Sequence, residues 1–145
     1  MTPRWKRLRR TWAGAAVVAA AVLVMSSATA AQGADPEALC NASRPGGALQ
    51  YTNDAEGWPK PLPNGQGNVY LYYESATGHN CAVTVSSGGY ADIGIRRTDG
   101  AGGAQWLTGS GSAGPVYVQA EEACVDVSGA AGDRSATWSG VNCGG

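Results

Sequence analysis

Apolar and polar side chains alternate on both sides of a turn near the middle of the chain. Within residues 69–74 every second side chain, starting with Val69, is apolar, and residues 81–86 repeat the pattern from Cys81. Alternation with period two is typical of a β-strand that buries one face. The residues between the two runs include Gly78, which tolerates a positive φ. The pattern predicts a β-hairpin around which the rest of the chain is organised.

Short runs of β-forming residues, separated by glycine-rich and serine-rich turns, continue to the end of the chain. We expect a weak strand at 47–51, further strands at 90–97, 104–108, 116–120, 124–127 and 135–138, and turns at 86–89 and 109–114. Gly94 would lie on the outer face of its strand, where a glycine indicates a bulge or the close approach of another group. Turns about every 8 to 12 residues predict an all-β fold, a small disulfide-bonded antiparallel β-sandwich or barrel.

The first thirty residues have the parts of a secretory signal peptide. Basic residues gather in 4–10, an apolar run follows at 13–25, and 28–30 reads Ala-Thr-Ala, a small-residue cleavage site. An apolar run of about thirteen residues is shorter than the roughly 20 that span a bilayer. The mature chain is therefore expected to be secreted and free of the membrane. The expected parts are a signal peptide at 1–30, a flexible leader at 31–36 and a single β domain at 37–145.

The charge of the mature chain excludes one class of partner. The residues after position 30 carry five basic and eleven acidic side chains, which gives a net charge of −6. The basic residues are scattered and form no stripe, although a phosphate backbone is bound by a basic stripe or patch. We therefore expect no nucleic acid partner.

All four cysteines follow the predicted signal peptide, and an even number of cysteines in an exported chain indicates disulfides. Zinc is the competing interpretation, but the chain has no Cys-x-x-Cys pair and a single histidine, so we expect no metal. Three pairings are possible. We favour Cys40 with Cys81 and Cys124 with Cys143, because sequential closure ties each flanking segment to a strand. Each bond would contribute roughly 3 to 4 kcal/mol.

Candidate catalytic groups are sparse in this sequence. His79, the one histidine, lies in the predicted hairpin turn and is expected to be an exposed turn residue. Ser110 and Ser112 lie among glycines without matching the Gly-x-Ser-x-Gly nucleophile motif. The adjacent carboxylates Glu121 and Glu122 are in a predicted turn, where such groups normally face water. We expect no enzyme activity, no catalytic residue and no cofactor.

Aromatic side chains give a better indication of function. Tyr70 and Tyr72 are expected on the outward face of the hairpin, and with Trp106 and Tyr117 they could form a flat binding face for sugars, peptides or another copy of the protein. The alternative is that these rings fill the core, because the chain contains no phenylalanine.

The segment from Trp58 to Gly65 is rich in proline, which disfavours both helix interiors and sheet ladders. We expect a long surface loop that connects strands. A polyproline ligand for a partner is the alternative interpretation of the same residues.

Several motifs resemble the spore-associated protein A family of secreted actinobacterial proteins. They are Tyr-Leu-Tyr at 70–72, Thr-Gly-His-Asn-Cys-Ala-Val-Thr-Val at 77–85, Ala-Gly-Pro-Val-Tyr-Val at 113–118, Cys-Val-Asp at 124–126 and Asn-Cys-Gly at 142–144. The likeness covers about Val69 to Gly144. This chain has Val-Ser at 127–128 where such relatives tend to have Trp-Gly, and its residues 44–67 match no family pattern. The resemblance implies an exported protein of the spore or aerial-hypha surface and brings no catalytic residues.

The resulting hypothesis is a non-catalytic, disulfide-bonded protein that is secreted and associated with the spore or cell surface, where it acts by surface binding or as part of the coat. Its expected partners are cell-surface or spore-coat components, among them a polysaccharide or a second copy of the chain. The alternative function is a secreted protease inhibitor that presents the loop Trp58 to Gly65, because small disulfide-bonded β scaffolds also serve that purpose.

Overall fold

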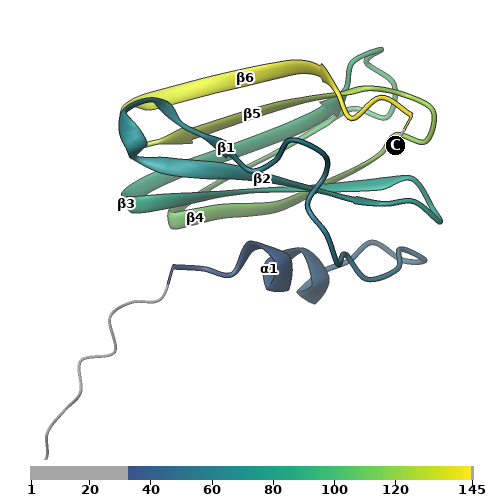
Figure 1. Ribbon diagram of the computed structural model, residues 1–145, viewed down its shortest axis with the longest axis horizontal. Helices are drawn as coiled ribbons and strands as arrows, with labels where there is room; N and C mark the ends of the chain where they lie inside the picture. Colours follow the sequence, from purple (N-terminus) through teal and green to yellow (C-terminus); the bar gives the residue numbers. More distant parts are fainter. Residues whose placement is uncertain (1–32, 145) are drawn as a thin grey trace, which may run out of the picture. The chain divides into compact units, whose positions relative to one another are not determined.

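The computed structural model describes residues 33–144, and the signal peptide predicted at 1–30 lies outside these residues. One helix precedes a series of β-strands (Figure 1). The elements are α1 (Pro36–Ala42), β1 (Lys60–Pro61), the short 3-10 helix η1 (Pro63–Gly65), β2 (Gly67–Glu74), β3 (His79–Arg97), β4 (Ala104–Gln119), β5 (Val125–Ala131) and β6 (Arg134–Val141). Within the described residues, no helix has the length and apolar character required to cross a membrane.

The strands form one antiparallel sheet in the order β1-β2-β3-β5-β6, with β4 paired to β3. β3 and β4 are long because each contributes to two layers. The first half of β3 pairs with β2 and with the second half of β4, whereas its second half pairs with β5 and with the first half of β4. The register between β3 and β4 shifts between Val85 and Tyr90, and the sheet bends there.

The bend curls the sheet into two layers. In Figure 1, β2 and parts of β3 and β4 lie below, and β5 and β6 lie above. This arrangement confirms the prediction of a small, disulfide-bonded all-β fold, and the predicted hairpin is formed by β2 and β3. The turns predicted at 86–89 and 109–114 were wrong, because both segments lie inside continuous strands, with a bulge at 86–89 of β3. Glycine and serine permit a sharp bend there, and the pairing continues beyond it.

Apolar side chains from both layers meet in the main core. The fully buried members from the strands include Val69, Leu71, Ile93, Ile95, Val125 and Val127. The layers approach each other closely at Gly129 of β5, where an added Cβ would lie 2.3 Å from a methyl carbon of Val69. Gly129 is therefore required by the packing between the layers.

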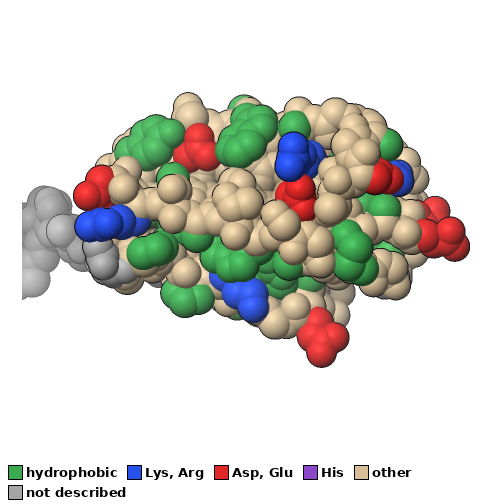
Figure 2. All heavy atoms as spheres, turned by 90° about the horizontal axis from the view of Figure 1, so that it is seen from above, with side chains coloured by type: hydrophobic (Ala, Val, Ile, Leu, Met, Phe, Trp, Pro, Cys, Tyr) green, Lys and Arg blue, Asp and Glu red, His purple; other side chains and the backbone are tan. Residues whose placement is uncertain are grey.

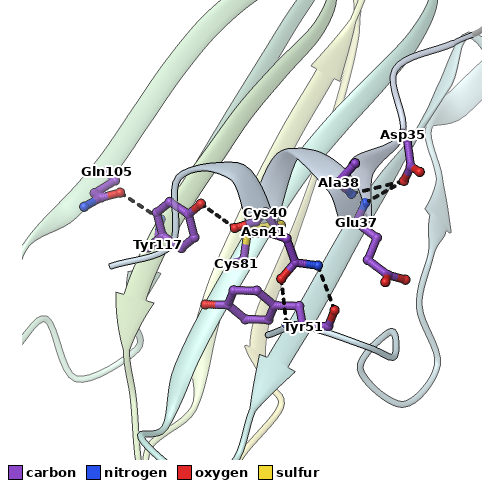
Figure 3. The surroundings of a disulfide bond; sticks show 9 residues. All are labelled: Asp35, Glu37, Ala38, Cys40, Asn41, Tyr51, Cys81, Gln105 and Tyr117. Carbon is purple, nitrogen blue, oxygen red and sulfur yellow. Dashed lines mark hydrogen bonds between the residues drawn. A yellow bond between two sulfur atoms is a disulfide. The ribbon is translucent and has the colours of Figure 1, made fainter. Parts of the chain in front are cut away.

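The N-terminal segment covers the outer face of the lower layer. Asp35 caps α1 by accepting hydrogen bonds from the backbone amides of Glu37 and Ala38. The helix begins at Pro36, which the sequence had placed in a flexible leader. The disulfide Cys40–Cys81 then attaches α1 to β3 (Figure 3).

The second disulfide, Cys124–Cys143, joins the residue before β5 to the segment after β6. Both bonds are therefore the pairs that the sequence favoured. The first fixes a helix to a sheet face, and the second closes the end of the β5–β6 hairpin.

The segment from Trp58 to Gly65 is not the surface loop that the sequence predicts. It contains β1 and η1, and Trp58 and Leu62 are buried in the main core. The ring of Trp58 packs edge-on against that of Trp138 in β6, with centroids 5.3 Å apart. Apolar burial therefore decides the position of this segment in spite of its prolines.

Candidate binding face

Three of the four aromatic residues expected on one binding face lie under the N-terminal segment. Tyr72 is only 4% exposed, and Tyr70 and Tyr117 are partly buried against the same cluster. Trp106 lies in the upper layer and is 56% exposed. The structure thus corrects the prediction of a common face. The tyrosines do point outward from their sheet, but α1 and Tyr51 cover them.

The covered tyrosines are held by specific contacts. The hydroxyl of Tyr117 donates a hydrogen bond to the backbone carbonyl of Cys40, and the side-chain amide of Asn41 exchanges two hydrogen bonds with the backbone of Tyr51 (Figure 3). Tyr51 packs edge-on against Tyr72 with ring centroids 6.4 Å apart. Burial raises the pKa of Tyr51, Tyr72 and Tyr117 above the ordinary tyrosine value. These rings therefore stabilise the fold and present little surface to a ligand.

Trp106 is different because its ring lies over a glycine. It is the cross-strand neighbour of Gly94, and a Cβ added to Gly94 would lie 2.4 Å from two carbons of the indole ring. The ring can therefore lie directly on the backbone of β3 only because Gly94 has no side chain. The glycine at position 94 predicts the close approach of another group, and that group is the Trp106 ring. The opposite side of the indole remains open to solvent as a flat apolar platform.

Polar side chains continue the row across the sheet. Gly94 is also the neighbour of Ser128 in β5, and Ser128 is the neighbour of Thr137 in β6. The two hydroxyl groups are 2.9 Å apart and share a hydrogen bond. Together with Trp106, these residues line a hollow of about 270 Å³.

Arg96 and Asp126 also line this hollow. The guanidinium group of Arg96 is 3.0 Å from the carboxylate of Asp126, and its side chain is 59% exposed. Asp126 also accepts hydrogen bonds from the hydroxyl of Thr98 and the backbone amide of Gly140. These contacts, led by that of Thr98, hold the pKa of the Asp126 carboxyl below its usual value. Asp126 is thus a fixed anion, and Arg96 is oriented beside the hollow with part of its surface open.

We define the Trp106 face as the outward side chains of this layer. Inward-facing Ile93 and Ile95 alternate along β3 with the outward positions. The members of the face are Tyr90, Asp92, Arg96, Trp106, Ser128 and Thr137. Figure 2 looks down on the layer that contains β5 and β6, and hydrophobic, acidic and basic side chains lie side by side on this surface.

The one histidine belongs to a different part of the molecule. His79 is the first residue of β3, is partly buried, and its Nδ1 atom is 2.6 Å from the hydroxyl of Thr77. That hydroxyl donates to the buried carboxylate of Glu74. Burial acts to raise the pKa of Glu74, but hydrogen bonds from the Thr77 hydroxyl and three backbone amides outweigh it, and the pKa is lowered. The network fixes the β2–β3 turn and the preceding loop at Leu49.

A larger hollow of about 680 Å³ lies beside the bend of the sheet. Its lining is mostly glycine and serine, such as Ser86 and Ser112, and contains no aromatic ring among the described residues. A third hollow of about 350 Å³ lies beside His79 and Arg97. Arg97 there is already paired with Asp99 through two hydrogen bonds. The Trp106 face is the better candidate because it combines a half-exposed ring with polar groups.

Sequence reasoning identified Trp106 but missed its polar neighbours. Arg96, Ser128 and Thr137 come from three strands and form no motif along the chain. Only the cross-strand register brings them together, and the bend in β3 hides that register in the sequence. Gly94 was the one local signal, since a glycine within a strand of β-forming residues is unusual.

The comparisons with known proteins give one relative. The chain is 42% identical over 84 residues to Spore-associated protein A of Streptomyces coelicolor, a match that covers 54% of each chain. The chain thus spans about half the length of the curated relative that it matches. No family model and no solved structure match the chain. The motifs and this comparison agree, and over the matched residues the chain is similar to Spore-associated protein A.

Proposed function

We propose that this chain is an exported, non-catalytic protein of the spore or cell surface that binds a neutral polysaccharide through the Trp106 face. The relative is named for its association with spores, and two disulfides suit a protein that functions outside the cell. The observation that carries the choice of surface is the indole of Trp106, which rests on Gly94 and is 56% exposed.

The chemistry of the face fits a sugar chain. The flat indole can stack against the apolar C–H face of a sugar ring, and the hydroxyls of Ser128 and Thr137 and the guanidinium of Arg96 can exchange hydrogen bonds with its hydroxyl groups. The hollow is lined by residues from β3, β4, β5 and β6, and a ligand that crosses several strands is better matched by an extended polymer than by a small molecule. The net charge of −6 after position 30 disfavours an anionic polymer.

The protease inhibitor is not favoured by the position of its proposed loop. An inhibitor presents an exposed, extended segment to the enzyme, whereas Trp58 and Leu62 are buried in the core and Lys60 pairs with β2. The prolines of this segment lie at the surface, but the two large apolar side chains that could occupy a protease pocket do not.

Co-sedimentation with insoluble polysaccharides tests the proposal. The mature chain is mixed with chitin and with cellulose, two neutral polysaccharides, and the bound fraction is compared with that of Trp106→Ala. Leu49→Ala is the matched control, because Leu49 is 58% exposed and lies outside the face. We expect at least one polymer to bind the wild type and Leu49→Ala, and Trp106→Ala to bind about tenfold or more weakly. Equal binding of both variants, or no binding of the wild type to any neutral polymer, would contradict the proposal.

A further inference from the structure

The first half of β4 is an edge strand with an unused hydrogen-bonding side. Residues 104–110 pair with residues 90–96 of β3, and β4 pairs with no other strand in the described part of the chain. An unpaired edge is a template for another strand, and proteins normally protect such edges with charge, proline or a covering segment.

The other edges of the sheet carry this protection. β1 contains only two residues, one of which is Pro61. β6 lies beside η1, and its Trp138 packs against Trp58. The second half of β4 contains Pro115, and the amide of Tyr117 is already bonded to the side-chain oxygen of Gln105 at 2.7 Å.

Residues 104–110 lack each of these devices. They contain no proline, and no charged residue occurs anywhere from Gly100 to Ala120. Every residue from Ala104 to Thr108 is exposed, and Trp106 and Leu107 are 56% and 47% exposed. Trp106 and Leu107 are consecutive in a strand, so they point to opposite faces and leave apolar surface on both sides of the same edge.

We propose that residues 104–110 of β4 pair with the same residues of a second copy in an antiparallel, two-fold symmetric arrangement. A second copy fits because the mature chain carries a net charge of −6 and would repel itself elsewhere, whereas this uncharged strand can approach its own copy without like-charge contacts. Residues 33–144 of each copy contain one such edge, so the pairing closes at a dimer.

The geometry follows from the register. Pairing centred on Leu107 sets the Leu107 side chains of the two copies opposite each other and places each Trp106 opposite Thr108 of the other copy. Both Trp106 rings then lie on one continuous outer surface. The dimer is independent of any ligand, and it goes beyond the proposed function by joining two binding faces.

Sedimentation equilibrium of the mature chain over a wide range of concentrations tests the proposal without a polysaccharide. We expect the mass to rise with concentration from one chain to two. Leu107→Lys places a charge at the edge in each copy and should raise the dissociation constant about tenfold or more. Leu49→Lys, the same change at an exposed leucine outside the edge, should leave the constant unchanged.

Hydrogen exchange of the wild type locates the contact without any substitution. Amides within residues 104–110 should exchange more slowly at high than at low concentration, while those of β6 should not change. A monomer at every concentration, assembly beyond a dimer, a dimer insensitive to Leu107→Lys, or protection outside β4 would each overturn the proposal. A wild type that forms the dimer but binds no neutral polysaccharide would contradict only the proposed function.

Discussion

The disulfide Cys40–Cys81 should have a larger role in the fold than Cys124–Cys143, and replacing each pair by alanine tests this. The first bond holds α1 over the tyrosine cluster of the lower layer. The second closes the end of one hairpin whose strands are already paired.

The expected magnitudes follow from the loops that the bonds close. The sequence separations are 41 and 19 residues. The chain-entropy relation gives a loss of about 4 kcal/mol for the first bond and about 3 kcal/mol for the second. Only the first loss releases α1, and with it the cover over Tyr51 and Tyr72, so that variant should also expose apolar surface while the sheet persists.

Guanidinium unfolding monitored by circular dichroism measures the free energies, and the fluorescence of an apolar dye reports exposed surface. We expect the variant without Cys40–Cys81 to be the less stable and to bind dye below its unfolding transition. The variant without Cys124–Cys143 should bind no dye before it unfolds. The reasoning is refuted if the order of stability is reversed, or if neither variant binds dye in its folded state.

Three further substitutions test separate parts of the structure. Gly94→Ala should displace the Trp106 ring from β3 and raise the quenching of tryptophan fluorescence by acrylamide. Because the ring can move into solvent, the free energy of unfolding should change by less than about 1 kcal/mol. Unchanged quenching would contradict the contact between Trp106 and Gly94. Tyr117→Phe removes the hydrogen bond to the Cys40 carbonyl and should cost about 1 kcal/mol in chemical unfolding, so a neutral result would argue against that bond. Glu74→Gln should cost about 2 kcal/mol at neutral pH. Because the pKa of Glu74 is lowered in the folded state, the ionised carboxylate stabilises the fold above the unfolded pKa of about 4, and this stabilisation is lost as the pH falls through the folded pKa. Glu74→Gln should therefore lose less stability on acidification than the wild type. Parallel pH profiles of the two proteins would contradict this.

The sequence predicted the hairpin well because its alternation is local. Val69 and Leu71 lie in the main core, as the period-two pattern requires. The two-layer form was not predictable in the same way, because Ser86 to Gly89 has the composition of a turn, and only the long-range pairing of β3 with β4 and β5 shows that the strand continues.

The prediction of an exposed tyrosine face was wrong for a related reason. Tyr72 is the cross-strand neighbour of Cys81, so both side chains lie on one face of the sheet. A disulfide from Cys81 to Cys40 must therefore bring the N-terminal segment over Tyr72. The favoured disulfide pairing and the hairpin register together imply that the N-terminal segment covers Tyr72, although neither of them implies it alone.

The most direct test of the account is the binding of the mature chain to washed Streptomyces spores. Wild type, Trp106→Ala and Leu49→Ala are incubated with the spores, and protein is measured in the supernatant, in a salt wash and in a detergent extract. The account predicts that the wild type and Leu49→Ala appear in the detergent extract, whereas Trp106→Ala stays in the supernatant. Equal retention of Trp106→Ala on the spores, or no retention of the wild type, would contradict it.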